Sequence, residues 1–186
     1  MQSETVYRFK LDDGSEVRVR RETPDDLPLM IDLFEHVSPE SRLDWAGSHP
    51  ESADHAAAVR EATRLAELDR GGSVAWLAFA DRPDRASIPV AGGRYTPSES
   101  GPAELSVVVR DDMQRQGIGS RLLYFVLDQA RADGIGEART SFENGNEAAW
   151  QVLQYSPYHI TWQPCGKQVE VMIHLQARTG SSASLN

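Results

Sequence analysis

The stretch AELSVVVRDDMQRQGIGSRLL, residues 103–123, says most about the fold of this chain. It begins with an apolar segment of strand type at 103–109 and continues through a polar segment that contains Gly117 and Gly119. Apolar residues at helical spacing then follow. A strand that enters a helix through such a loop presents backbone N–H groups and the positive end of the helix dipole. The junction therefore predicts a site for phosphate groups.

Three other interpretations of these glycines can be compared with the phosphate site. A glycine-containing turn without a ligand remains open, because glycine is common in all proteins. A dinucleotide-binding loop of the Rossmann type needs a third glycine where this chain has Leu122. A P-loop needs Gly-Lys-Ser or Gly-Lys-Thr after the glycines, and the sequence has neither here.

The sequence on both sides predicts an α/β domain. Alternating apolar residues and turn signals predict strands, and apolar residues at helical spacing predict helices. The expected strands form a hairpin at 5–21, three consecutive segments at 74–80, 88–95 and 103–109, one at 137–142, and a pair at 158–162 and 168–175. The expected helices begin after Thr23, at 53, after Gly117 and at 146. Because this order is not a regular βαβ alternation, we expect an antiparallel meander over 74–109.

Composition limits the classes of function. The chain has 186 residues and a net charge of −9, so we expect one domain and no broad attachment to nucleic acid or to anionic membranes. No apolar run has the length of a membrane span or of a secretory signal. Cys165 is the single cysteine, so no intrachain disulfide can form, and we expect a cytoplasmic protein. The histidines show no metal-ligand spacing, so we expect no metal site.

The segment Gln114–Gly119 (QRQGIG) resembles the acetyl-CoA signature of the GNAT superfamily of N-acetyltransferases. That signature has Arg or Gln, two residues, Gly, one residue, and then Gly or Ala. The resemblance implies a single-domain GNAT fold, with a central mixed and mostly antiparallel sheet flanked by helices. It covers about residues 16–176. Residues 1–15 then carry the first strand of the hairpin, and the small, polar residues 177–186 are expected to be a disordered tail.

The resemblance also implies which residues contact acetyl-CoA. Backbone amides at 115–120 would hold the pyrophosphate, and the main chain of 107–109 would pair with the pantetheine arm like an added strand. Asn146, with Ala149 three residues later, matches a further pantetheine contact. A helix N-cap is the alternative role for Asn146. The implied cofactor-binding residues are Val107, Val108, Val109, Gln114, Arg115, Gln116, Gly117, Ile118, Gly119, Ser120 and Asn146.

A narrower resemblance is to the catalytic domain of Pat-type protein lysine acetyltransferases. It rests on DGSEVRVR (13–20), TPDD (23–26), SPESR (38–42, with Arg42 as a substrate-side or a packing residue) and Ala103-Glu104. It implies that Glu104 is the general base that deprotonates the acceptor amine. A carboxylate in a mostly apolar strand is expected to be partly buried, and partial burial suits a base for an ammonium group. Strand alternation puts Glu104 on the face opposite Leu105. The alternative is a surface glutamate paired with an arginine such as Arg94.

The general acid is not fixed by the resemblance. The family usually has a tyrosine seven residues after the asparagine, and this chain has Leu153 there. Tyr155 is about 200° further round the helix and should point elsewhere. Tyr158 follows Pro157 and is the candidate that could reach the cleft from the next strand, with solvent as the alternative.

The sequence thus predicts an acetyl-CoA-dependent N-acetyltransferase that acts on an amine. A protein lysine and a small-molecule amine both remain open as acceptors, and a non-catalytic acyl-CoA-binding module is the alternative from another class. The expected partners are acetyl-CoA and the amine, without nucleic acid or membrane. The sequence does not decide between a monomer and a homodimer.

Overall fold

The computed structural model describes residues 5–38, 41, 54–70, 72–82 and 85–176. Arg42 and the tail at 177–186 lie outside the described residues. The strands are β1 (Thr5–Lys10), β2 (Glu16–Arg21), β3 (Val74–Arg82), β4 (Arg85–Thr96), β5 (Ala103–Val109), β6 (Glu137–Glu143), β7 (His159–Cys165) and β8 (Gln168–His174). The described helices are α1 (Leu27–Glu35), α3 (His55–Arg70), α4 (Ile118–Ala132) and α5 (Glu147–Gln154), with short 3₁₀ turns at Pro24–Asp26 and Asp111–Met113.

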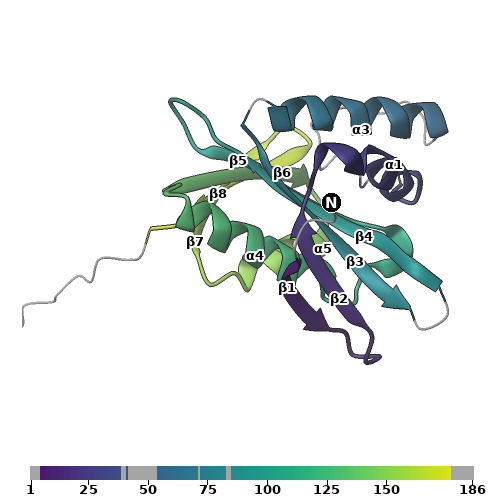
Figure 1. Ribbon diagram of the computed structural model, residues 1–186. Coiled ribbons are helices and arrows are strands. Elements are labelled where there is room, and N and C mark those ends of the chain that lie inside the picture. Colours follow the sequence, from purple (N-terminus) through teal and green to yellow (C-terminus); the bar gives the residue numbers. More distant parts are fainter. Residues whose placement is uncertain (1–4, 39–40, 42–53, 71, 83–84, 177–186) are drawn as a thin grey trace, which may run out of the picture.

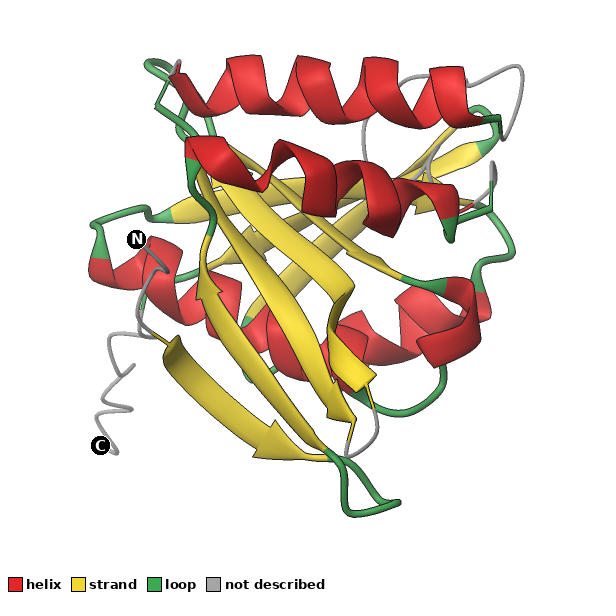
Figure 2. Ribbon diagram, turned by 45° about the vertical axis from the view of Figure 1, so that its right-hand side comes forward, coloured by secondary structure: helices red, strands yellow, loops and turns green. Residues whose placement is uncertain are grey.

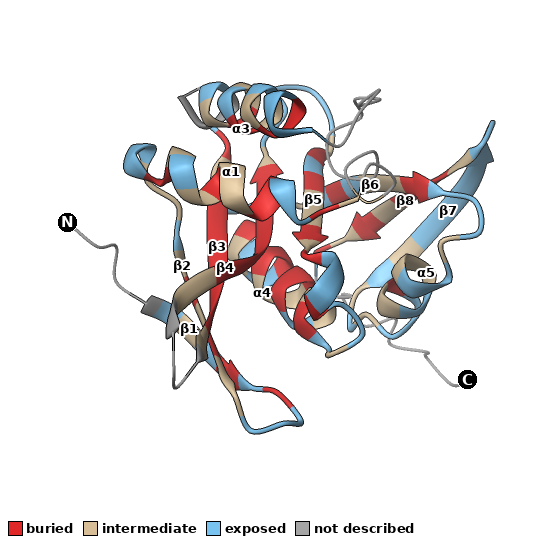
Figure 3. Ribbon diagram, turned by 90° about the vertical axis from the view of Figure 1, so that its right-hand side faces the viewer, coloured by how far each residue is buried: buried red, intermediate tan, exposed pale blue. Residues whose placement is uncertain are grey.

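The strands in the described part of the chain form one eight-stranded sheet in the order β1-β2-β3-β4-β5-β6-β8-β7. Helices α1 and α3 cover one face, and α4 and α5 lie on the other (Figures 1 and 2). Each face has its own core, because strand alternation sends successive side chains to opposite sides. Leu77, Phe79 and Val108 pack with α1 and α3, whereas Trp76, Ala78 and Leu105 pack with α4. The sheet is therefore buried on both faces at its centre, where β3 and β4 lie (Figure 3).

The predicted local signals are confirmed at the N-terminal end. β1 and β2 form the expected antiparallel hairpin, and its turn places Gly14 at a φ of 85°. The capping box before α1 is present: the backbone N–H of Thr23 donates to Asp26 Oδ2 at 2.7 Å. The same carboxylate binds Arg20 through both oxygens at 2.7 Å, so this buried ion pair fixes the entry of α1 against β2.

The meander over β3, β4 and β5 is confirmed as antiparallel. Gly93 in β4 permits the close packing of α4 on this meander. A Cβ atom there would stand 2.9 Å from Cγ2 of Val126 and 3.1 Å from Cγ of Leu122, both on α4. At the other end of the chain one bound was wrong: β7 continues to Cys165 instead of ending at 162, so the turn before β8 is shorter than expected.

The pairing of β5 with β6 is the feature that positions the site. These strands are parallel, and they pair only at Ala103↔Ala138 and Glu104↔Arg139. On its other edge β6 pairs with β8 along its whole length, from Glu137↔His174 to Glu143↔Gln168. On its other edge β5 pairs with β4. The sheet therefore splits into two halves that diverge from one closed end, and the edge of β5 that faces β6 has no strand partner beyond Glu104.

No helix in the described part of the chain is both long and apolar enough to cross a membrane.

Candidate active site

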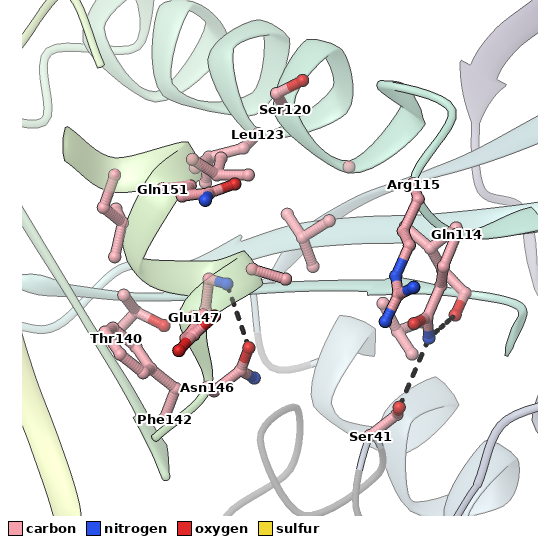
Figure 4. Close-up of a pocket in the computed structure, with 18 of the residues that line it drawn as sticks. Ser41, Gln114, Arg115, Ser120, Leu123, Thr140, Phe142, Asn146, Glu147 and Gln151 are labelled. Carbon is pink, nitrogen blue, oxygen red and sulfur yellow. Dashed lines mark hydrogen bonds between the residues drawn. The ribbon is translucent and has the colours of Figure 1, made fainter. Parts of the chain in front are cut away.

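A cleft of about 730 Å³ occupies the space between the diverging strands. It is lined by β5, the loop at 113–117, the start of α4, the end of β6 and α5 (Figure 4). Its lining consists of Ser41, Leu105, Val107, Val108, Val109, Met113, Gln114, Arg115, Gly117, Gly119, Ser120, Leu123, Thr140, Ser141, Phe142, Asn146, Glu147, Ala148, Ala149, Gln151, Val152 and Leu153. One long cleft thus joins the glycine loop to the closed end of the split.

The cleft is lined from both faces of the sheet. Leu105 and Phe142 belong to the core on the α4 side. Val108 belongs to the core on the α1 and α3 side, and Ser141 alternates with Phe142, so it faces that side too. This confirms the expected alternation along β5. It also means that two molecules can meet within the sheet from opposite faces.

The loop before α4 has a backbone suited to an anion. Gly117 is the N-cap of α4 with a φ of 78°, and Arg115 also has a positive φ, of 60°. A positive φ is costly for an arginine, and such strain is found most often at functional sites. Turns with left-handed residues direct successive N–H groups into one concavity, next to the positive end of the α4 dipole. The Arg115 side chain lies beside Gln114 on this side of the cleft (Figure 4).

Gly119 has a different reason to be glycine. A Cβ atom there would stand 3.4 Å from Cγ2 of Val109, which is ordinary contact, and its backbone is not left-handed. The fold itself therefore tolerates a methyl group at this position. Because Gly119 and Val109 both line the cleft, the missing side chain leaves room for a ligand between them.

Gln114 ties the loop to the neighbouring segments. Its Nε2 donates to the carbonyl oxygen of Val109 at 3.2 Å, to Asp111 Oδ1 at 3.0 Å and to Ser41 Oγ at 3.4 Å. Asp111 also accepts a hydrogen bond from the backbone of Ser38 at 3.0 Å. The side chain of Gln114 therefore helps to hold the shape of the loop.

The N-cap role predicted for Asn146 is confirmed, and the predicted pantetheine contact stays a prediction. Asn146 is the N-cap of α5, where its Oδ1 accepts the N–H of Ala149 at 3.0 Å, and it lines the cleft opposite the glycine loop (Figure 4). Most of the other predicted cofactor-binding residues line the cleft as well. The exceptions are Gln116, whose amide reaches Met113 Sδ at 4.0 Å, and Ile118, which is 1% exposed and packs in the core.

Glu104 lies at the closed end of the split, but it is not buried. Its side chain is 54% exposed and forms an ion pair with Arg139, which is 45% exposed. The hydrogen bond to Glu104 raises the pKa of Arg139. The alternative, a surface glutamate paired with an arginine, agrees with this exposure and this ion pair, but the arginine is Arg139 and not Arg94. Arg94 is buried: its Nη2 lies 3.7 Å from Glu22 Oε2, and its Nη1 donates to the carbonyl oxygen of Leu65. Neither Glu104 nor Arg139 lines the cleft; the next residue of each strand does.

The prediction that Tyr158 reaches the cleft is wrong. Its hydroxyl donates to Asp128 on α4, and burial, followed by this hydrogen bond, raises the pKa of Tyr158. Tyr155 is 77% exposed, as its helical position predicts. Leu153 does line the cleft, so the position of the usual tyrosine is correct but holds no hydroxyl. Among the described lining residues there is no tyrosine, histidine or cysteine.

Two parts of the site were not predicted. Arg139 was missed because its proximity to Glu104 depends on the register of β6, which the sequence does not give. Ser41, Thr140, Glu147 and Gln151 were missed because polar residues of these types carry no distinctive spacing. Within the described ranges, no group of three or more His, Cys, Asp or Glu side chains could hold a metal ion.

In this fold, the sheet splits between β5 and β6, and the cleft in the split leads to a glycine loop at the N-terminus of α4. The model of the acetyltransferase (GNAT) family matches residues 31–155. The chain belongs to this family.

Solved structures share the fold. The GNAT domain of S. lividans PAT is 22% identical, with a TM-score of 0.72 over 90% of this chain and 96% of that one. The PaiA N-acetyltransferase of Thermoplasma acidophilum, solved with coenzyme A, is 16% identical, with a TM-score of 0.60 over 85% of this chain and 98% of that one.

A curated relative is similar over a shorter stretch. It is an L-methionine sulfoximine/L-methionine sulfone acetyltransferase of Pseudomonas paraeruginosa, 39% identical over 73 residues. The match covers 38% of this chain and 42% of the relative, so it spans well under half of each protein.

Proposed function

We propose that this chain is an acetyl-CoA-dependent N-acetyltransferase. The observation that carries the proposal is the split between β5 and β6, whose cleft of about 730 Å³ runs from the glycine loop to Leu105, the residue next to Glu104. The residues present fit acetyl-CoA. The left-handed Gly117, the open space at Gly119 and the start of α4 suit its pyrophosphate, and the unpartnered edge of β5 suits its pantetheine arm.

This placement gives the reaction a direction along β5. If the phosphates lie at the loop, an arm that runs back along Val109 and Val107 brings the thioester towards Leu105, at the closed end. Bound acetyl-CoA supplies the activated acyl group there. A backbone N–H on the open edge of β5 near Val108 polarises the thioester carbonyl as a fixed dipole.

Glu104 is the proposed general base. It accepts a proton from the acceptor ammonium, directly or through one water, so that the neutral nitrogen can attack the carbonyl carbon. Its exposure makes the carboxylate accessible to an acceptor that arrives from the α1 and α3 side of the sheet. Water protonates the leaving sulfur, because the described cleft lining offers no tyrosine, histidine or cysteine for this step.

We infer that the acceptor is a small amine, with a protein lysine as the second candidate. The curated relative, which is named for acetylation of methionine derivatives, supports the small molecule. The likeness to the PAT domain concerns the fold and does not favour either acceptor. A catalytic unit of residues 16–176 and a cytoplasmic location complete the proposal, and the choice between a monomer and a homodimer stays open.

The test is thiol release from acetyl-CoA, measured with a panel of amino acids, polyamines, aminoglycosides and lysine peptides. We expect release that depends on the amine, with the acetylated product identified by mass. Binding of CoA without thiol release for any amine would instead indicate a non-catalytic acyl-CoA-binding module.

A further inference from the structure

Two opposite charges flank the closed end of the cleft. Glu104 and Arg139 are the last paired residues of β5 and β6 before the strands diverge. The next residues, Leu105 and Thr140, both line the cleft. The two charged side chains therefore lie within one residue of the point where the proposed function brings thioester and amine together.

The surroundings of Arg139 are acidic. The strands β5, β6, β8 and β7 are all described, and Arg139 is the single arginine among their residues. Its Nη1 lies 3.9 Å from Glu170 on β8, in addition to the contact with Glu104. The guanidinium has five donors in a planar fork, so it can bind a ligand carboxylate in place of Glu104 when that contact opens.

The ion pair can open at low cost. Both side chains are about half exposed, and exposed pairs contribute little to stability because water solvates the separated charges. A ligand that offers one cation to Glu104 and one anion to Arg139 can therefore replace the contact between them. The ligand's two charges must be close together, since the two side chains touch.

We propose that the acceptor is a free α-amino acid, whose carboxylate binds Arg139 while its ammonium group faces Glu104. This inference rests on the proposed function and names the acceptor class of the same site. An α-amino acid carries its two charges on one carbon, which matches the contact between the two side chains. A lysine side chain or a polyamine brings a cation without the anion, so it offers no carboxylate to Arg139 once the contact with Glu104 opens.

The transfer balances as follows. The α-ammonium loses one proton to Glu104, the nitrogen forms a bond to the acetyl carbon, and the carbon–sulfur bond breaks. The sulfur leaves as the thiolate and takes a proton from water. The nitrogen loses its second excess proton to solvent, which gives an N-acetyl amino acid and free CoA thiol.

The first test needs only the wild-type protein. Thiol release is measured with each of the twenty common L-amino acids and with the matching carboxamides, which keep the amine and the side chain but have no negative charge. Spermidine and a lysine peptide blocked at both ends complete the panel. We expect at least one amino acid to exceed its carboxamide in kcat/KM by about 10- to 100-fold, the range expected for a charged hydrogen bond.

The second test assigns the carboxylate to Arg139. In Arg139→Ala, the ratio of kcat/KM for the amino acid to that for its carboxamide should fall by about 10- to 100-fold, mainly through KM. Arg139→Lys should recover part of the ratio, because it keeps the charge without the fork. The matched control is Arg8→Ala, which removes another exposed ion pair, with Glu16, far along the sheet on β1, and should leave the ratio unchanged.

Two results would overturn the proposal while the N-acetyltransferase survives. One is a wild-type preference for carboxamides, spermidine or the lysine peptide over every free amino acid. The other is an unchanged ratio in folded Arg139→Ala and Arg139→Lys. If instead CoA does not bind and no amine gives thiol release, the proposed function itself fails, and the acceptor inference fails with it.

Discussion

The carboxylate of Glu104 and the guanidinium of Arg139 meet where β5 and β6 part. One strand supplies the proposed base and the other supplies its counter-ion. The pair marks the end of the parallel ladder and the beginning of the cleft, so it joins the fold to the proposed chemistry. Variants at either residue test the two separately.

Glu104→Gln should lower turnover by about 10²- to 10⁴-fold near neutral pH, because it keeps the shape but removes the proton acceptor. Affinity for CoA should remain nearly unchanged, since Glu104 is outside the cleft lining. Steady-state kinetics and a CoA titration measure the two effects. Glu137→Gln is the matched control, as an exposed glutamate on the same face of β6. Full turnover in folded Glu104→Gln would make the carboxylate only a structural partner of Arg139.

Gly119→Glu and Gly119→Ala together should separate ligand binding from folding. Gly119→Glu puts a bulky anion at the start of α4, where the phosphates are expected, so CoA affinity should fall by about 10- to 100-fold. Gly119→Ala is the matched control, because the acetyl-CoA signature accepts Gly or Ala at this position and the added methyl group meets Val109 at an ordinary contact distance. We expect Gly119→Ala to keep its CoA affinity and its thermal stability. Native CoA affinity in folded Gly119→Glu would place the phosphate site elsewhere.

Tyr158→Phe should affect stability and not catalysis. It removes the hydrogen bond to Asp128, at a cost of about 1 kcal/mol in the free energy of unfolding. Turnover per folded molecule should stay the same, because the hydroxyl points to α4 and not into the cleft. Tyr155→Phe, at an exposed position, is the control for both measurements. A large loss of turnover would restore Tyr158 as the general acid.

Asp26→Ala should be strongly destabilising at neutral pH, by about 3–5 kcal/mol, since it leaves Arg20 buried without its partner. Burial raises the pKa of Asp26, but hydrogen bonds from Arg20 and Thr23 outweigh it, so the pKa lies below its usual value. A lowered pKa in the folded state stabilises the protein above the unfolded pKa, and this contribution is lost as pH falls through the folded pKa.

The difference between wild type and Asp26→Ala should therefore shrink in acid. Denaturant unfolding at a series of pH values measures it, with the exposed neighbour in Asp25→Ala as a control that stays within about 0.5 kcal/mol. A difference that stays constant down to acid pH would mean that the carboxylate stabilises the fold without its charge.

The sequence predicted what depends on local pattern. The alternation along β5, the capping box at Thr23 and the N-cap at Asn146 are all set by neighbouring residues, and all are present. The glycine loop was found because Gln114–Gly119 resembles the acetyl-CoA signature and lies between a predicted strand and a predicted helix.

The parts that were missed depend on pairing between distant segments. Arg139 is 35 residues from Glu104 and reaches it only through the register of a two-residue parallel ladder. The exposure of Glu104 follows from the same split, because β6 pairs with β5 only as far as this residue. The direction of the Tyr158 side chain was predicted wrongly, because the preceding Pro157 does not determine it. The hydrogen bond from the Tyr158 hydroxyl to Asp128 on α4 determines it.

The most direct test of the central claim, that the split between β5 and β6 holds CoA, is a thermal and denaturant titration of the wild-type protein with CoA. ATP and NAD serve as comparison ligands. Binding to the folded state alone stabilises it by mass action, so CoA at about 100 times its dissociation constant should raise the free energy of unfolding by about 2.7 kcal/mol. A response to NAD or ATP with none to CoA would contradict the account.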